Sequence, residues 1–244
     1  MRPAGQAGHG DPTGDVVFDA AVADLYAGRD AQCQLHPQVV FEDVPAPRKL
    51  APYAAAISAT VQAAGPGEQP DIGWGRLVLL YDPDGQPGWS GQFRVIAYIR
   101  ADVEAEIAAD PLLGKVSWSW LTEALDARAV GYAVPSGTVT RVVTEGFGGK
   151  QGEPPATGLE LRASWSPTGP TPTRPAPTAD GTRGALAPPA LAPPAPAPPV
   201  PVPALAPPAL AGHVAAWCDA LCAAAGLPPA AAGVIVMPRP RRRP

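Results

Sequence analysis

The stretch RLVLLYDPDGQPGWSGQFRVIAYI, residues 76–99, decides the fold class of this chain. Large apolar residues alternate with other residues on both sides of its centre: Leu77, Leu79, Tyr81, Phe93, Val95, Ala97 and Ile99. The centre opens with DPDG at 82–85, a composition typical of turns. Because alternation with period two places every second side chain on one face of a strand, the stretch predicts a β-hairpin with a long loop.

A second antiparallel pair is expected farther along the chain. Residues 137–145 are rich in Thr and Val, and LELRASW at 159–165 alternates apolar with other residues. Upstream, residues 39–44 predict a short strand. Residues 53–62 fit both the helical and the strand period, and we favour the strand.

Three helices complete the expected elements. The first is amphipathic and is expected to end at Gly28, and the second begins with Asp110 and Pro111 and runs to about Arg128. The third spans 211–228, and one of its faces carries Val214, Trp217, Cys218, Leu221 and Ala225. Because so short a helix is marginally stable alone, we expect its apolar face to dock on the core.

A Pro/Ala-rich segment interrupts this pattern, and within it the string ALAPPAL occurs at 185–191 and again at 204–210. Proline removes backbone donors and favours an extended path, so the segment predicts a disordered spacer. The predicted fold is α+β, an antiparallel sheet of about five strands packed with three helices. The predicted parts are a disordered tail (1–12), an α+β core (13–166), the spacer (167–210), a docked C-terminal helix (211–228) and a basic disordered tail (229–244).

Composition excludes several classes of protein. The chain has 244 residues and a formal net charge of −4, which disfavours a protein that mainly coats nucleic acid. We find neither a signal peptide nor an apolar run long enough to span a membrane, so we expect a cytoplasmic protein without membrane association. Its three cysteines are too few for a disulfide framework, which agrees with a reducing compartment.

Several strings resemble an actinobacterial family of domains of unknown function, numbered 3000. They are PAPRKLAPY at 45–53, DPLL at 110–113, SWSWLTEALDAR at 117–128, SGTVTR at 136–141, FGG at 147–149, LRASW at 161–165 and HVAAWC at 213–218. The resemblance implies membership and brings no activity, cofactor or catalytic residue. The order of elements also resembles that of type III secretion chaperones, an analogy of fold that does not fix function.

Three groups of residues resemble parts of known chemical sites. Cys218 and Cys222 lie one turn apart on a predicted helix with His213 before them, but a structural zinc site needs four ligands. The loop EGFGGK at 145–150 lacks the residues of a P-loop, and we interpret it as a hairpin loop. Asp102, Glu106 and Asp110 are four residues apart, a spacing that could place paired carboxylates on one helix face but is common on solvated surfaces.

Nucleophilic catalysis also lacks its motif, because there is no Gly-x-Ser-x-Gly elbow and no histidine placed to act as a base. We therefore predict no catalytic, cofactor-binding or metal-binding residue and incline against an enzyme. The candidate partner contacts are Trp118, at the margin of a predicted apolar arc, and Arg48 with Lys49, between prolines.

The sequence thus predicts a non-catalytic binding module, an adaptor or chaperone-like protein for an unknown protein partner. One alternative is a small-molecule-binding protein or an enzyme whose pocket is assembled from residues scattered along the chain. A weaker alternative is contact with nucleic acid through Arg239, Arg241, Arg242 and Arg243 of the tail.

Overall fold

The computed structural model describes residues 12–65, 67, 69–152, 155–169 and 208–227. Residues 1–11 of the expected N-terminal tail, most of the expected spacer and the basic tail with its four arginines lie outside the described residues. The domain boundaries given above stay a prediction.

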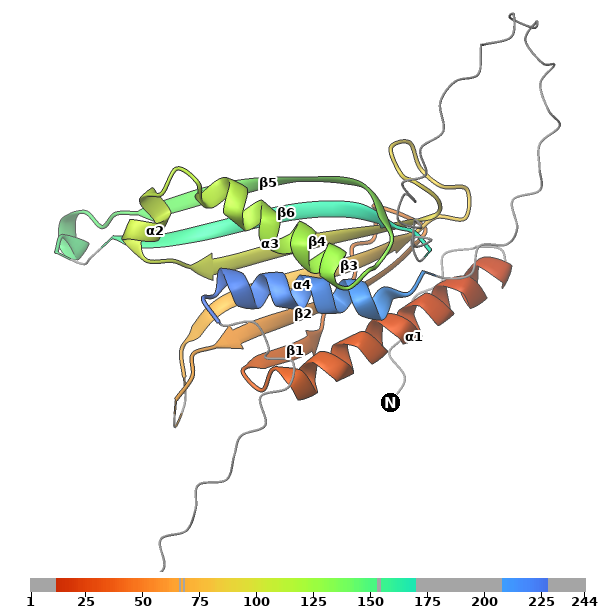
Figure 1. Cartoon of the computed structure of the whole chain (residues 1–244), viewed down its shortest axis with the longest axis horizontal. Helices are drawn as coiled ribbons and strands as arrows, with labels where there is room; N and C mark the ends of the chain where they lie inside the picture. The colour runs from red at the N-terminus through yellow and green to blue at the C-terminus, as the bar shows by residue number, and fades with distance from the viewer. Residues whose placement is uncertain (1–11, 66, 68, 153–154, 170–207, 228–244) are drawn as a thin grey trace, which may run out of the picture.

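A six-stranded antiparallel sheet forms the centre of the described structure, in the order β1-β2-β3-β4-β6-β5 (Figure 1). The strands are β1 (Val39–Asp43), β2 (Tyr53–Gln62), β3 (Asp71–Tyr81), β4 (Phe93–Asp102), β5 (Tyr132–Thr144) and β6 (Ala156–Pro167). β3 and β4 are the hairpin expected from residues 76–99, and β2 is the strand that the ambiguous stretch 53–62 forms. The α+β class is therefore confirmed, with six strands where we expected about five.

The helices α1 (Pro12–Leu35), α3 (Leu113–Ala127) and α4 (Leu210–Ala224) lie on one face of the sheet, and α2 (Ala105–Ala109) is a short turn of helix before α3 (Figure 1). α4 occupies the middle of this layer, because it contacts α1 on one side, α3 on the other and the strands beneath. Its Trp217 and Leu221 are fully buried. α4 is therefore a central part of the core.

Our prediction that the first helix ends at Gly28 was wrong, since α1 continues to Leu35. Gly28 lies where α1 crosses α4, and a β-carbon there would stand 2.6 Å from the α-carbon of Ala211. The glycine permits the two backbones to approach closely and does not end the helix.

The second expected helix was placed correctly, although it begins three residues later than Asp110. The Asp110 carboxylate accepts a hydrogen bond from the backbone N–H of Leu112 at 2.8 Å, just before α3. The sequence predicts that the apolar arc of this helix consists of Leu113, Val116, Trp120, Leu121, Ala124 and Leu125. This was wrong at Val116, which is exposed. Ser117 is buried in the arc instead, because its hydroxyl donates to the Leu113 carbonyl and so satisfies its polar atom within the helix.

Candidate functional site

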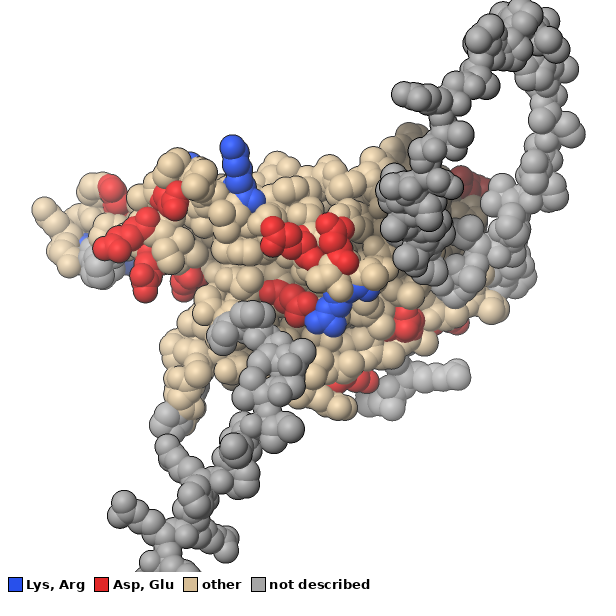
Figure 2. Space-filling view, viewed as in Figure 1, with Lys and Arg blue, Asp and Glu red and all other residues tan. Residues whose placement is uncertain are grey.

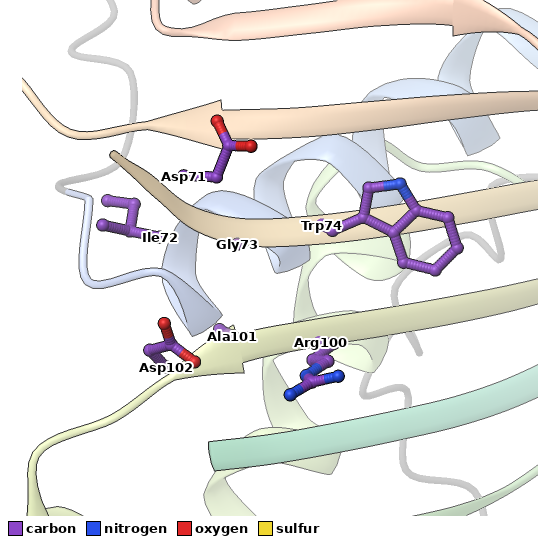
Figure 3. Close-up of a pocket in the computed structure, with 7 residues that line it drawn as sticks. All are labelled: Asp71, Ile72, Gly73, Trp74, Arg100, Ala101 and Asp102. Atoms are coloured by element: carbon purple, nitrogen blue, oxygen red, sulfur yellow. The ribbon is translucent and has the colours of Figure 1, made fainter. Parts of the chain in front are cut away.

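The face of the sheet that lies away from α1, α3 and α4 carries aromatic and charged side chains. We call the side chains of Trp74, Arg76, Tyr98, Arg100, Glu160 and Arg162 the open face. They alternate along β3, β4 and β6 with the core residues beneath the helices. In Figure 3, which looks at the strands from the open face, α4 lies behind them.

Trp74 and Tyr98 form an aromatic pair on this face. Their ring centroids are 5.4 Å apart and their planes are inclined at 60°, an edge-to-face arrangement. Trp74 keeps 38% of its surface exposed, which is unusual for the largest apolar side chain. The pair is thus an apolar platform that solvent reaches.

Arginines surround the platform. Strand register places Arg100 beside Trp74, and places Arg76 and Arg162 on either side of Tyr98. The Arg162 guanidinium lies 5.4 Å from the Tyr98 ring centroid and donates to Glu160 at 3.1 Å. Burial, together with a hydrogen bond to Glu160, raises the pKa of the Tyr98 hydroxyl, so this residue is neutral over the physiological range.

A shallow hollow of about 300 Å³ opens beside the platform (Figure 3). Its walls include Trp74 and Arg100 on neighbouring strands, with Asp71 at the start of β3 and Asp102 at the end of β4. Aromatic, cationic and anionic groups therefore meet within one small area.

At the other end of β4, Arg94 borders a second hollow of about 340 Å³. It is 8% exposed, and it donates to the Ser164 hydroxyl at 2.7 Å and to the Val134 carbonyl at 3.1 Å. Among the described residues it makes no ion pair, and burial alone lowers the pKa of Arg94. A nearly buried guanidinium without a carboxylate is uncommon, because burying an unpaired charge is costly.

The backbone around Arg94 is strained. Val134 has φ 50°, in a left-handed region that β-branched residues rarely occupy, and it precedes Pro135. The register of β5 shifts here, between Ala133 and Ser136. This irregularity directs the Val134 carbonyl to Arg94, and such strain is concentrated at functional sites.

The predicted contacts Arg48 and Lys49 are exposed on the segment 44–51, which covers part of the same side of the sheet. This segment packs over Ala56 and Val78, and its Leu50 lines the Arg94 hollow. The two cations therefore directly precede a residue that lines the Arg94 hollow. Their role in binding stays a prediction.

Trp118, the other predicted contact, lies on the opposite side of the sheet. It is half-buried, and it packs against Gly137 of β5 so closely that a β-carbon on Gly137 would stand 2.5 Å from its ring. In this position it covers the rim of the core, and its role in binding also stays a prediction.

The helix-covered side differs in charge from the open face, since Asp and Glu predominate among the charged side chains in the view of Figure 2. A molecule with net charge −4 thus collects several arginines on the sheet side. This asymmetry favours an anionic partner on the open face.

His36, Cys218 and Cys222 form a cluster inside the helical layer. Their ligand atoms lie within 4.8 Å of one another, and all three residues are buried. A hydrogen bond from the Cys218 thiol to Cys222 raises the pKa of Cys218 and lowers that of Cys222. Two thiols and an imidazole are ligands that zinc prefers.

His213, which we considered beside these cysteines, faces elsewhere. Its Nδ1 accepts a hydrogen bond from the Trp165 indole at 3.1 Å. Burial lowers the pKa of His213 to about 4, so its ring is neutral at pH 7.

The remaining groups from the sequence do not form sites. Asp102 ends β4, Glu106 lies on α2 and Asp110 follows α2, so the three do not share a helix face. The loop 145–150 connects β5 to β6 through a single 3₁₀ turn, Gly148–Lys150, as expected of a hairpin loop. None of the described helices combines the length and apolar character that crossing a membrane requires.

Sequence reasoning missed His36, Trp74 and Arg94. For Arg94 the alternation along 76–99 contained a signal, because this residue falls between the core positions Phe93 and Val95 and therefore on the other face. Trp74 lies just before that stretch, between two glycines of β3, and no alternation of large apolar residues marks its position. Nothing local pairs His36 with Cys222, since the two are 186 residues apart.

Comparison with known proteins gives one result. No curated protein matches the chain, and no solved structure matches it. The profile of the family described as "Protein of unknown function (DUF3000)" matches residues 15–235. This range includes the open face, the Arg94 hollow and the buried cluster. The chain therefore belongs to the DUF3000 family.

Proposed function

We propose that this protein is a non-catalytic binding module that holds an acidic, extended segment of a protein partner across the open face of its sheet. The observation that carries the proposal is Arg94, a guanidinium that borders a hollow and lacks a carboxylate among the described residues. Both terminal nitrogens of Arg94 already donate hydrogen bonds, to the Val134 and Ser164 carbonyls and to serine hydroxyls. A carboxylate of the partner at the hollow would therefore balance the charge of the guanidinium.

The distance between the two ends of the face suits an extended peptide. Arg100 lies six positions after Arg94 along β4, which corresponds to about 20 Å of strand. A partner segment of six or seven residues can therefore reach from the Arg94 hollow to the platform. There Trp74 and Tyr98 would pack against apolar side chains, as Trp, Tyr and Arg do at the centres of interfaces.

The cytoplasm is the compartment we propose. All three cysteines are free, and Cys218 and Cys222 lie beside each other without a disulfide. Free thiols are typical of a reducing compartment.

Site-specific photo-crosslinking in the native host tests the proposal. A photoreactive amino acid replaces Trp74 on the open face, and in a matched control it replaces Val116, which is exposed on α3. The expected result is one crosslinked protein, found from position 74 and absent from position 116. The crosslinked peptide of that partner, identified by mass spectrometry, should be rich in Asp and Glu.

Charge reversal provides the second comparison. Arg100→Glu with Arg162→Glu should abolish the crosslink, and Lys115→Glu on α3 should leave it unchanged, since all three side chains are exposed. A crosslink that is indifferent to both reversals, or one formed to nucleic acid, would contradict the proposal. Crosslinks to a second copy of this chain would replace it with self-association.

A further inference from the structure

We propose that His36, Cys218 and Cys222 bind one Zn²⁺ ion, which fastens the end of α1 to the middle of α4. The site lies within the helical layer, on the other side of the sheet from the open face, and is independent of the function proposed for that face.

The distances suit zinc. Zn–S bonds of about 2.3 Å and Zn–N bonds of about 2.0 Å in a tetrahedron separate sulfur from nitrogen by about 3.5 Å. His36 Nδ1 lies 3.8 Å from Cys222 Sγ. The Cys218 sulfur lies within 4.8 Å of both. Small side-chain rotations would bring all three atoms to one ion, and its fourth position would be taken by solvent or a small ligand.

The second ring nitrogen of His36, Nε2, lies near a carboxylate, as in many zinc sites. This nitrogen is buried without a hydrogen-bond partner in the described structure and lies 3.8 Å from Asp219 Oδ1. Arg128 donates twice to the other oxygen of Asp219, from Nε at 3.0 Å and from a terminal nitrogen at 2.7 Å. A metal-ligating histidine characteristically directs its second nitrogen to a carboxylate, which fixes the tautomer with Nδ1 free for the metal.

Charge balance favours a divalent ion. On binding, Zn²⁺ would displace one proton from each thiol to solvent, and the two thiolates would neutralise its charge. The neighbouring Arg128–Asp219 pair is also neutral as a unit. A buried site with no net charge avoids most of the cost of desolvating ions.

Two simpler interpretations account for less. Buried cysteines often act as small apolar residues, but that does not explain a buried imidazole whose Nδ1 is directed at a thiol. A disulfide between Cys218 and Cys222 would leave His36 equally unexplained. Coordination gives each of the three side chains a function.

Metal analysis of the full-length chain tests the site. The protein is stripped with a chelator under reducing conditions, reloaded with Zn²⁺ or Co²⁺ alone and desalted. We expect one ion per chain, and we expect the Co²⁺ form to show sulfur-to-metal charge transfer and the strong visible bands of a four-coordinate thiolate site. Stripping should lower the melting temperature, and Zn²⁺ should restore it.

Variants separate this site from surface binding. Cys222→Ser and His36→Asn should lose the ion and the thermal response, whereas Cys33→Ser, at the exposed cysteine, should retain both. Asp219→Asn should weaken zinc binding by about 10- to 100-fold. Since a variant can also fail to fold, the wild-type measurement decides. The proposal is overturned if the folded wild type takes up no stoichiometric ion, or if Cys33→Ser abolishes uptake.

Discussion

The Trp165 indole donates a hydrogen bond to His213 Nδ1 at 3.1 Å, across 48 residues of sequence and inside the core. Trp165 lies on β6 and His213 on α4, so the bond joins the sheet to the central helix. It also requires a neutral imidazole nitrogen as acceptor.

Stability should therefore fall in mild acid. The pKa of His213 is about 4 in the folded protein against 6.5 unfolded, so between these values the unfolded chain binds the extra proton. The free energy of unfolding should decrease as the pH falls below about 6.5 and lose about 3 kcal/mol by pH 4. Urea denaturation at a series of pH values measures this. His213→Gln should remove this decrease in the free energy of unfolding between pH 6.5 and pH 4. An identical pH dependence in both proteins would show that His213 does not cause it.

Gly28→Ala should destabilise the protein even though alanine favours helices. The added methyl group would stand 2.6 Å from the Ala211 backbone, and overpacking of this kind costs about 1–3 kcal/mol. The control is Gly114→Ala on α3, where the added β-carbon would have no neighbour within 4 Å beyond the backbone of its own helix. There we expect the free energy of unfolding to rise by up to about 1 kcal/mol. Thermal unfolding compares the two. Equal gains at both positions would show that α1 and α4 are not in tight contact.

Asp24→Ala should cost about 1 kcal/mol of unfolding free energy. The Asp24 carboxylate on α1 accepts the backbone N–H of Ala211 at 3.0 Å, in the first turn of α4, and so caps a helix 187 residues away in sequence. Asp19→Ala, at an exposed position of the same helix, should change stability by less than about 0.5 kcal/mol. If the two variants unfold at the same temperature, the hydrogen bond from the Ala211 N–H to Asp24 contributes nothing to stability.

Gly137→Ala should displace Trp118 and disturb the pairing of β5 with β6, because its new methyl group would stand 2.5 Å from the Trp118 ring and even closer to the Arg162 carbonyl oxygen. Tryptophan emission should shift to longer wavelength as the ring moves into solvent. Gly158→Ala on β6, where the nearest atom stands at 3.5 Å, should leave the spectrum unchanged. Unchanged emission in Gly137→Ala would show that Trp118 does not rest on this glycine.

Local pattern predicted the alternating strands β3, β4 and β6 well, but it left β2 ambiguous and missed the first residues of β5. Leu159 and Leu161 alternate with polar residues, and both are buried beneath the helices. Gly28 misled us because a glycine at a helix crossing and a glycine at a helix end look alike in sequence. Only the position of Ala211, far along the chain, distinguishes them.

The candidate sites were less predictable, because each depends on contacts between distant segments. Arg94 stands out because it has no carboxylate partner among the described residues. That absence cannot be seen in a sequence, which does not show which residues lie near one another. His36 could not be matched with Cys222 before the crossing of α1 and α4 was known. The spacing of Cys218 and Cys222 on one helix was visible in the sequence, but without His36 it led us to predict no metal site there.

The position of α4 has a consequence for biosynthesis. The groove between α1 and α3, floored by Gly73 and Gly75, is filled by α4, which follows the strands and the other described helices in sequence. During translation the six strands are made before α4, so the sheet can pair while this apolar groove is still open, and the described core is complete only after α4 leaves the ribosome. A chain that stops before α4 would therefore expose apolar core residues that the complete fold covers, which makes it prone to aggregation.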